Sequence, residues 1–285
     1  MRSRDVVDAL MFCLMLAGCA LAMTMIGCAE PALVVGTFNV RYDTEQDGPD
    51  AWSAGRRHRV ELAIRALDPD VMAIQELLPR QLEELRADLA DGWLLESADA
   101  GGSPQSNAIL YRGARLRLTG VERRWLGPDP TIPGSRWGDA YPRVALRASL
   151  VDRLTGEAFR FTATHTNGGG PAGRAEWDQL MKEFAPQPGD ILGGDFNELW
   201  GPNVWGLAPG GPRAREAGWD DLVGPATAPP AGWSGGPPGA AWDPTGRVDW
   251  LVGAGFEVLS STVAPIRVDG RACSDHWPVT ATVVR

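Results

Sequence analysis

The chain has 285 residues, 44% of them hydrophobic and 22% charged, which is the composition of an ordinary globular protein and favours a single folded domain. Its formal net charge is -9, and the charges in the first eight residues cancel, so the body that would remain after removal of a leader is equally acidic. Affinity for a phosphate backbone comes mainly from clustered Lys and Arg, so this charge argues against a non-specific polyanion-binding protein, although not against nucleic-acid chemistry at a metal site.

The N-terminal residues 1–28 have the pattern of a signal peptide, most closely the lipoprotein type. Two arginines lie in the first four residues, residues 9–26 are almost wholly apolar, and Gly-Cys pairs end at Cys19 and Cys28. Lipidation of either cysteine would tether the protein to a membrane. Cys19 has the better consensus, but Cys28 is favoured because cleavage there leaves no apolar stub. An uncleaved single-span anchor and a plain secretory signal are the alternatives. We therefore expect an exported protein of the cell envelope, the periplasm or the extracellular space.

The first part of the body alternates strand and helix patterns. Residues 32–40 form a short apolar run typical of a strand, and residues 54–67 place their apolar side chains on one helical face. A buried strand is predicted at residues 71–75. Pro79 can open a second helix, since the first helical turn needs no N–H donor at that position, and leucines at helical spacing follow it. This alternation predicts parallel strand pairing.

The rest of the body is richer in strands, separated by Gly, Pro and Asp turns. One further helix is predicted at residues 172–184 and a strand ends at Gly194. The remaining strand candidates are residues 107–111, 116–125, 144–151, 159–165, 248–252, 257–264 and 279–284.

Because strands outnumber helices and parallel and antiparallel signals are mixed, we expect two sheets packed face to face with helices outside them, all within residues 29–285. Residues 201–246 are rich in Gly, Pro and Trp and are predicted to form a long loop. A loop of this length in a compact domain is usually functional or disordered, and its Trp content argues against disorder. The rings either fill a small core under the loop or form a wall on which a substrate stacks.

Polar side chains follow the predicted strands. At these positions a rigid sheet can bring side chains from distant segments together at one point. Singly, each has an ordinary structural explanation, such as a turn or a solvated edge. Taken in chain order, they closely resemble the motif series of the endonuclease/exonuclease/phosphatase superfamily, which also contains enzymes resembling pancreatic DNase, inositol-polyphosphate phosphatases and neutral sphingomyelinases. The residues that carry this resemblance are Asn39, Glu76, His165, Asp195 with Asn197, Asp249, and Asp275 with His276.

The resemblance covers essentially the whole body and is strongest with a bacterial branch whose substrates are poorly assigned. It includes the opening at residues 38–43, its continuation at residues 47–52, and the segments 125–126, 133–135 and 142–143. The resemblance implies a DNase I-like α/β (α+β) fold, a four-layer α/β/β/α sandwich of two mixed β-sheets. It also implies a divalent-metal-dependent phosphoesterase.

The resemblance further implies an all-oxygen metal site. Glu76 matches the direct ligand, and Asn39 and Asp275 would complete a site that suits Mg²⁺ or Mn²⁺ better than zinc. Hydrolysis of a phosphoester requires a hard cation on a non-bridging oxygen, a water opposite the leaving group, and donors for the growing charge.

Further matches supply the remaining catalytic roles. Asp195 matches the residue that orients or deprotonates the attacking water, and Asn197 the one that holds the water and the phosphoryl group. His276 would contact the phosphate as an imidazolium or hydrogen-bond donor, with Asp249 fixing its tautomer and raising its basicity.

His165 matches a second phosphate contact, and Arg143 is a candidate bidentate phosphate clamp, with a surface ion pair as the alternative. The segment after His165 departs from the family pattern. Relatives tend to carry Leu-Asp-His, whereas this chain has Thr166-Asn167 followed by three glycines. The loss of a carboxylate and an imidazole puts in doubt a second metal position or the usual substrate of the branch.

We expect a small or membrane-displayed phosphoester as the substrate, rather than duplex DNA, because the body is acidic and its only lysine is Lys182. An extracellular nuclease of the same fold is the main alternative. A catalytically decayed surface-binding lipoprotein is the other, and it is disfavoured because the motif residues are retained. A monomer is expected.

Overall fold

The computed structural model describes residues 31–285 except 139, 169, 199–209 and 224–246. The predicted signal peptide, residues 1–28, lies outside the described residues. Among the helices that the structure does describe, none combines the length and apolar character needed to cross a lipid bilayer.

The first sheet has six strands in the order β11-β14-β1-β2-β4-β3. Strands β1 and β2 pair in parallel, and every other neighbouring pair in this sheet is antiparallel. The strands are β1 (Leu33–Asn39), β2 (Val71–Leu77), β3 (Trp93–Asp99), β4 (Ser106–Arg112), β11 (Glu257–Val263) and β14 (Val279–Val284).

The second sheet has six strands in the order β5-β6-β7-β8-β10-β9. Only β7 and β8 pair in parallel, so this sheet is mixed as well. A short hairpin, β12 (Arg267–Val268) with β13 (Arg271–Ala272), lies outside both sheets. The strands of the second sheet are β5 (Leu116–Trp125), β6 (Val144–Asp152), β7 (Ala158–His165), β8 (Asp190–Asp195), β9 (Asp220–Asp221) and β10 (Asp249–Ala254).

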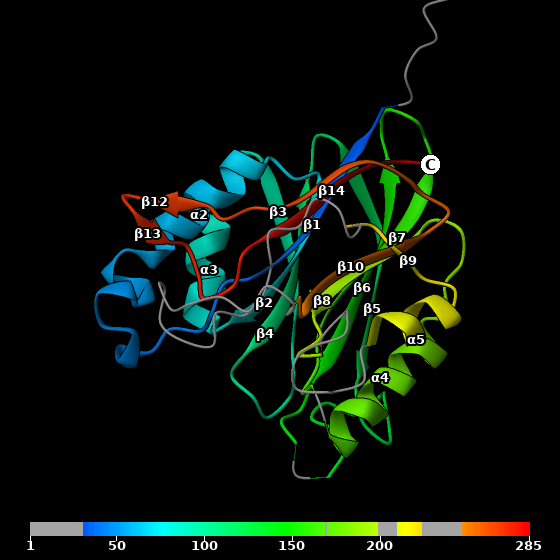
Figure 1. Ribbon diagram of the computed structural model, residues 1–285. Coiled ribbons are helices and arrows are strands. Elements are labelled where there is room, and N and C mark those ends of the chain that lie inside the picture. The colour runs from blue at the N-terminus through cyan, green and yellow to red at the C-terminus, as the bar shows by residue number, and fades with distance from the viewer. Residues whose placement is uncertain (1–30, 139, 169, 199–209, 224–246) are drawn as a thin grey trace, which may run out of the picture. The chain divides into compact units, whose positions relative to one another are not determined.

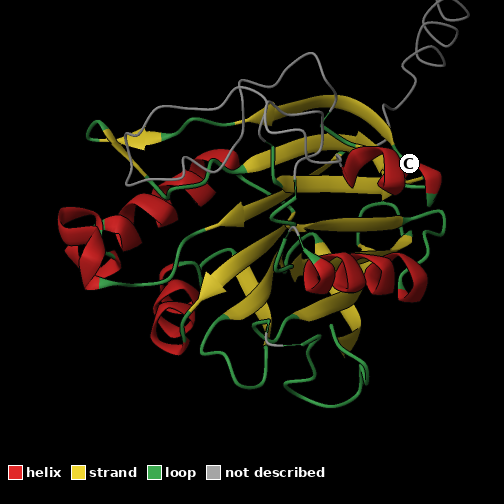
Figure 2. Ribbon diagram, turned by 60° about the horizontal axis from the view of Figure 1, so that its bottom comes forward, coloured by secondary structure: helices red, strands yellow, loops and turns green. Residues whose placement is uncertain are grey.

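Helices cover the outer face of each sheet (Figures 1 and 2). Helices α2 and α3 lie on the first sheet and α4 and α5 on the second, and each pair shares an apolar core with its sheet. A third core contains side chains from both sheets and fills the space between them. The helical segments are η1 (Glu45–Asp50), η2 (Trp52–Ala54), α2 (Arg56–Leu67), α3 (Pro79–Asp88), α4 (Pro171–Glu183) and α5 (Gly210–Glu216). The expected four-layer α/β/β/α sandwich of two mixed sheets is confirmed.

The prediction of one long loop at residues 201–246 is wrong for its described part. Residues 210–216 form helix α5, and β9 follows it. Gly210 packs so closely against the Trp250 ring that a Cβ at this position would lie 2.1 Å from it, and the absence of a side chain lets this helix approach β10. Trp219 is fully buried in the outer core, in agreement with the packing interpretation for this one ring. The other tryptophans of the loop lie outside the described residues.

Candidate active site

The two sheets bring the predicted strand-end residues to one edge of the sandwich. Parallel strands end at the same edge, so Asn39 at the end of β1 lies beside the end of β2, with Gln75 as its register partner. In the second sheet Asp195 pairs in register with His165 on one side and with Asp249 on the other. Pairing in the sheets therefore explains why residues far apart in the sequence meet here.

Local backbone irregularities aim two of these side chains. Glu76 has a φ of 67° and lies where the register of β2 and β4 shifts, so a β-bulge turns its carboxylate toward the site. Asn197 has a φ of 47°, and its backbone N–H donates to Asp195 Oδ1 at 2.8 Å. Left-handed backbone at residues other than glycine is uncommon and concentrates at functional sites. The surrounding contacts therefore hold Glu76 and Asn197 in an uncommon backbone conformation, as is typical of functional sites.

The glycine before Asp195 is required by close packing. A Cβ at Gly194 would lie 2.2 Å from the main-chain oxygen of Thr164 on the neighbouring strand. No real Cβ makes such a contact, so only glycine lets β8 lie this close to β7. Asp195 and His165, one residue further along each strand, thereby come within 3.5 Å of each other, measured from Oδ2 to Nε2.

Asn39 links the acidic residues of the two sheets. Its Nδ2 donates to Glu76 Oε1 and to Asp195 Oδ2, both at 2.9 Å, while its Oδ1 accepts the Arg41 backbone N–H at 2.9 Å. The nitrogen therefore faces the carboxylates and the oxygen faces the main chain. In this arrangement Asn39 connects Glu76 and Asp195 and can orient both carboxylates.

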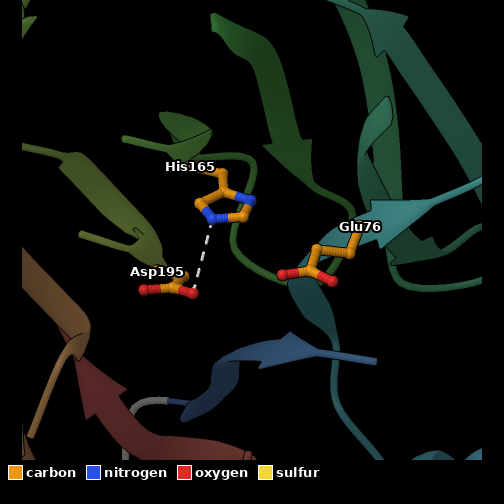
Figure 3. A group of neighbouring side chains, drawn as sticks. All are labelled: Glu76, His165 and Asp195. Atoms are coloured by element: carbon orange, nitrogen blue, oxygen red, sulfur yellow. Dashed lines mark ion pairs between the residues drawn. The ribbon is translucent and has the colours of Figure 1, made fainter. Parts of the chain in front are cut away.

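Glu76, His165 and Asp195 point toward one another (Figure 3), and their ligand atoms all lie within 4.8 Å of one another. Burial raises the pKa of Glu76, and it raises the pKa of Asp195 to about 6 with help from the charge of Asp249. Two carboxylates crowded into a desolvated site are unfavourable unless a cation offsets them. The donor set of this cluster therefore fits a divalent cation.

Asp249 and His276 form a second buried pair beside Asp195. His276 Nδ1 lies 2.7 Å from Asp249 Oδ2, and its Nε2 lies 3.7 Å from Asp195 Oδ2. Burial alone would lower the pKa of His276, but the Asp249 and Asp195 carboxylates outweigh it and hold this pKa well above 6.5. The imidazole is therefore favoured as an imidazolium whose Nε2–H points into the site.

His165 has the opposite electrostatic character. Burial and then the Arg143 charge lower the pKa of His165 well below 6.5, so its ring is neutral. Asn197 Nδ2 lies 3.0 Å from His165 Nε2 and donates to it, and it also donates to the Thr166 carbonyl at 2.9 Å. The two histidines of the site thus differ in charge because their neighbours differ.

The sequence departure after His165 builds a network that holds Arg143. Asn167 Oδ1 accepts from Arg143 Nε at 3.2 Å, and Asn167 Nδ2 donates to Glu176 Oε1 at 2.5 Å. Glu176 is fully buried on α4 and also accepts the Asn167 backbone N–H. An aspartate in place of Asn167 would bring a second carboxylate against Glu176. Glu176 was not among the residues identified from the sequence, because a glutamate on a helix carries no local signal of this role.

Asp275, the third expected metal ligand, lies buried near Glu76, whose pKa is raised by burial and further by the Asp275 charge. Its Oδ2 is paired with Arg41 Nη1 at 2.7 Å, and its Oδ1 accepts from Ser274 Oγ at 3.1 Å. Within the described part of the chain it belongs to neither group of converging ligand atoms. The structure therefore brings Asp275 to the rim of the site, in contact with a guanidinium. Arg41 was also not identified from the sequence, although it stands two residues after Asn39.

Two mixed sheets with outer helices, and an acidic and histidine-containing cluster at their common edge, define a DNase I-like phosphoesterase. A family model described as the Endonuclease/Exonuclease/phosphatase family matches residues 36–276, and the chain belongs to this family. Members of the family are hydrolases that act on phosphoester bonds, typically with a divalent metal. No curated protein matches the sequence.

Solved structures similar to this chain include three with related folds. An endonuclease/exonuclease/phosphatase from Bacteroides vulgatus is 24% identical with a TM-score of 0.74, covering 90% of this chain and 99% of that one. A mannosyl-6-phosphatase from Bacteroides thetaiotaomicron is 20% identical with a TM-score of 0.72, covering 89% and 100%. D. rerio TDP2 complexed with a single strand DNA product is 18% identical with a TM-score of 0.64, covering 90% and 100%. These similarities establish the shared fold.

Proposed function

We propose that this chain is an exported, Mg²⁺- or Mn²⁺-dependent phosphoesterase that hydrolyses a small or membrane-displayed phosphoester by in-line attack of water. The observation that carries the proposal is the convergence of Glu76, Asp195 and His165 from both sheets, with Asp249 and His276 beside them. Membership of the family supports phosphoester hydrolysis. The choice of metal, the substrate and the location are our proposals.

Glu76 is the proposed direct metal ligand, with Asn39 and Asp275 proposed to complete the site around the cation. The carboxylate oxygens of the site suit a hard cation such as Mg²⁺ or Mn²⁺. When bound, such a cation withdraws charge from a non-bridging phosphoryl oxygen. Asn39 would keep Glu76 and Asp195 at fixed positions through its two hydrogen bonds.

Asp195 is the proposed base that orients and deprotonates the attacking water. Its carboxylate is held by Asn39 Nδ2 and by the Asn197 backbone N–H, so its oxygens have little freedom to turn away. The amide of Asn197 would hold the water and the phosphoryl group. Neutral His165 is the proposed second phosphate contact, and it would have to donate a ring N–H to a phosphoryl oxygen in place of accepting from Asn197.

His276 and Arg143 are the proposed donors to the phosphoryl oxygens. Asp249 accepts from His276 Nδ1, which leaves Nε2–H to face the substrate, and the same carboxylate stabilises the imidazolium. Asn167 holds Arg143 by its Nε, and the two terminal nitrogens have no hydrogen-bond partner among the described residues, so these are proposed to bind phosphate. Charge that develops on the phosphoryl oxygens would thus meet preorganised donors.

A small substrate is favoured over duplex DNA by the distribution of basic residues. The chain has one lysine, and Arg124 at the end of β5 is paired with Glu122 and Glu183. A stripe of unneutralised cations along a nucleic-acid path would be needed for strong binding at physiological salt. The mannosyl-6-phosphatase and TDP2 share this fold, so the fold alone does not select the substrate.

A substrate panel tests the proposal. Purified protein with Mg²⁺ or Mn²⁺ would be given a hexose phosphate, p-nitrophenyl phosphate, bis-p-nitrophenyl phosphate, a phospholipid head-group ester and plasmid DNA. We expect small esters to be hydrolysed fastest, with rates that change little between low and physiological salt. Plasmid cleavage at physiological salt, faster than hydrolysis of every small ester, would contradict the substrate assignment.

Export and membrane tethering are proposed from the N-terminal pattern, with Cys28 as the favoured lipidated residue and Cys19 as the alternative. Cell fractionation with Cys28→Ser and Cys19→Ser tests both points. We expect Cys28→Ser, and not Cys19→Ser, to release the protein from the membrane. Recovery of unprocessed wild-type protein in the cytosol would contradict export, whereas a soluble mature form starting near Ala29 would contradict the lipid anchor alone.

A further inference from the structure

Arg41 is a charged residue at the site for which the mechanism above has no use. Its Nε and Nη2 form a bidentate pair with Asp47, and its Nη1 contacts Asp275 Oδ2 at 2.7 Å. The side chain of Asp47 is only 4% exposed and is held by Arg56, whose side chain has no exposed surface. Arg41 is therefore fixed from behind by a shielded ion network and reaches into the rim of the catalytic cluster.

The main chain also presents Arg41 to the site. Its φ is 59°, an uncommon conformation for a residue with a side chain, and its backbone N–H donates to Asn39 Oδ1. Its carbonyl accepts from Gln81 Nε2 and from Arg56 Nη2. Strained backbone persists where several surrounding contacts hold it in place. The contacts of the Arg41 backbone have this effect here.

The guanidinium keeps donor capacity toward the site. A guanidinium has five N–H donors. Three of them are directed at Asp47 and Asp275, which leaves one hydrogen on each terminal nitrogen without a partner among the described residues. The Arg41 side chain is 26% exposed, so part of it can be reached by a ligand. Planar guanidinium groups with two adjacent donors match the geometry of phosphate oxygens.

We propose that Arg41 is a second phosphoryl-binding residue and that it directs the enzyme toward phosphomonoesters. The inference rests on the proposed function and deepens it. Arg143 approaches from the second sheet and Arg41 from the first, with His276 beside them as a further donor. A phosphomonoester carries about two negative charges near neutral pH and three non-bridging oxygens, whereas a diester carries one charge and two such oxygens. Additional cationic donors therefore favour the monoester.

The experiment compares wild type with Arg41→Gln, Arg41→Lys and the control Arg57→Gln. Arg57 forms ion pairs with Asp88 and Glu84 on α2 and α3, away from the site, so the control removes a similar pairing arginine. Steady-state kinetics on p-nitrophenyl phosphate and bis-p-nitrophenyl phosphate would be measured with Mg²⁺. Calorimetric titrations would give the Kd of inorganic phosphate and, separately, of Mg²⁺.

We expect Arg41→Gln to raise the monoester KM and the phosphate Kd roughly 10- to 100-fold, the loss typical of a hydrogen bond between charged groups. The diester KM should change much less, and Mg²⁺ should bind as tightly as before or more tightly, since Asp275 is released from its guanidinium. Arg41→Lys should recover part of the loss, and Arg57→Gln should match wild type. If Arg41→Gln does not fold, Arg41→Lys carries the comparison, with an expected several-fold rise in the monoester KM because lysine keeps the charge and loses only part of the hydrogen bonding.

Unchanged phosphate affinity together with weaker Mg²⁺ binding would show that Arg41 only positions Asp275, and it would overturn the inference. A wild-type protein that hydrolyses the diester as well as the monoester, with an unaltered ratio in Arg41→Gln, would also overturn it. A wild-type protein that hydrolyses neither ester with Mg²⁺ or Mn²⁺ would instead contradict the proposed function.

Discussion

Substitution of Asp249 by Asn removes the negative charge from the Asp249–His276 pair and keeps a side chain of nearly the same shape. The amide can still accept from His276 Nδ1, but the negative charge 2.7 Å away, which stabilises the imidazolium, is lost. Hydrogen bonds to charged groups contribute about 1.5 to 3 kcal/mol. Since about 1.4 kcal/mol corresponds to a tenfold change in rate, kcat should fall roughly 10- to 150-fold.

The same substitution should lower stability for a separate reason. Asp249 Oδ1 is buried and has no hydrogen-bond partner among the described residues, so an NH₂ group in that position would be an unsatisfied donor. The destabilisation should be about 1 to 3 kcal/mol. At about 2 to 4 °C per kcal/mol for a domain of this size, Tm should fall by roughly 2 to 12 °C.

The assay is kcat on p-nitrophenyl phosphate with saturating Mg²⁺, together with Tm from circular dichroism. Asp220→Asn is the matched control, because Asp220 lies exposed on β9 beside β10 and makes no contact with the site residues that we describe. The control should retain wild-type kcat and Tm. A kcat for Asp249→Asn within about threefold of wild type would refute the reasoning, since the charge that stabilises the imidazolium would then contribute little to turnover.

Four further substitutions have distinct expected outcomes. Glu76→Gln should weaken Mg²⁺ binding by roughly tenfold or more in a calorimetric titration, because it removes a charged oxygen ligand. An unchanged Mg²⁺ affinity would show that Glu76 is not a ligand. Asp195→Asn should lower kcat by about 10²- to 10⁴-fold with metal binding largely intact, as for loss of a general base, and near-native turnover would show that another group activates the water. Asn167→Ala should raise KM several-fold, which corresponds to the net contribution of a typical hydrogen bond, about 0.5 to 1.5 kcal/mol, because Arg143 Nε loses its partner. An unaltered KM would show that Arg143 needs no support from Asn167. Gly194→Ala should lower the free energy of unfolding in urea by about 1 to 3 kcal/mol, because the added methyl group overpacks the strands. Wild-type stability would contradict the close approach of β8 to β7.

Strand-end motifs could be predicted from the sequence because each follows an apolar run, and pairing in the sheets then brings them together. Asp195 illustrates this, since its register partners His165 and Asp249 lie on the two neighbouring strands. The number of strands and the mixed pairing signals indicated two sheets with helices outside them, and the family resemblance implied the four-layer arrangement. The strands and helices could be predicted because the spacing of apolar residues within each segment indicates its secondary structure.

Features that depend on tertiary contacts could not be predicted. The bulge at Glu76 carries no Gly or Pro signal, because the left-handed conformation is imposed by the surrounding structure. The edge strand β3 was missed, since its mixed polar sequence does not alternate cleanly between buried and exposed residues. The pairing of Asp275 with Arg41 joins residues 234 positions apart, and nothing in either local sequence indicates it.

The most direct test of the central claim is phosphate or nitrophenol release by purified mature protein from p-nitrophenyl phosphate and bis-p-nitrophenyl phosphate, with Mg²⁺ or Mn²⁺ and with chelator. We expect release that requires the cation, stops on chelation, returns on readdition of metal and is absent in Asp195→Asn. No release from either ester, or the same rate in chelator and in Asp195→Asn, would contradict a metal-dependent phosphoesterase centred on Glu76 and Asp195.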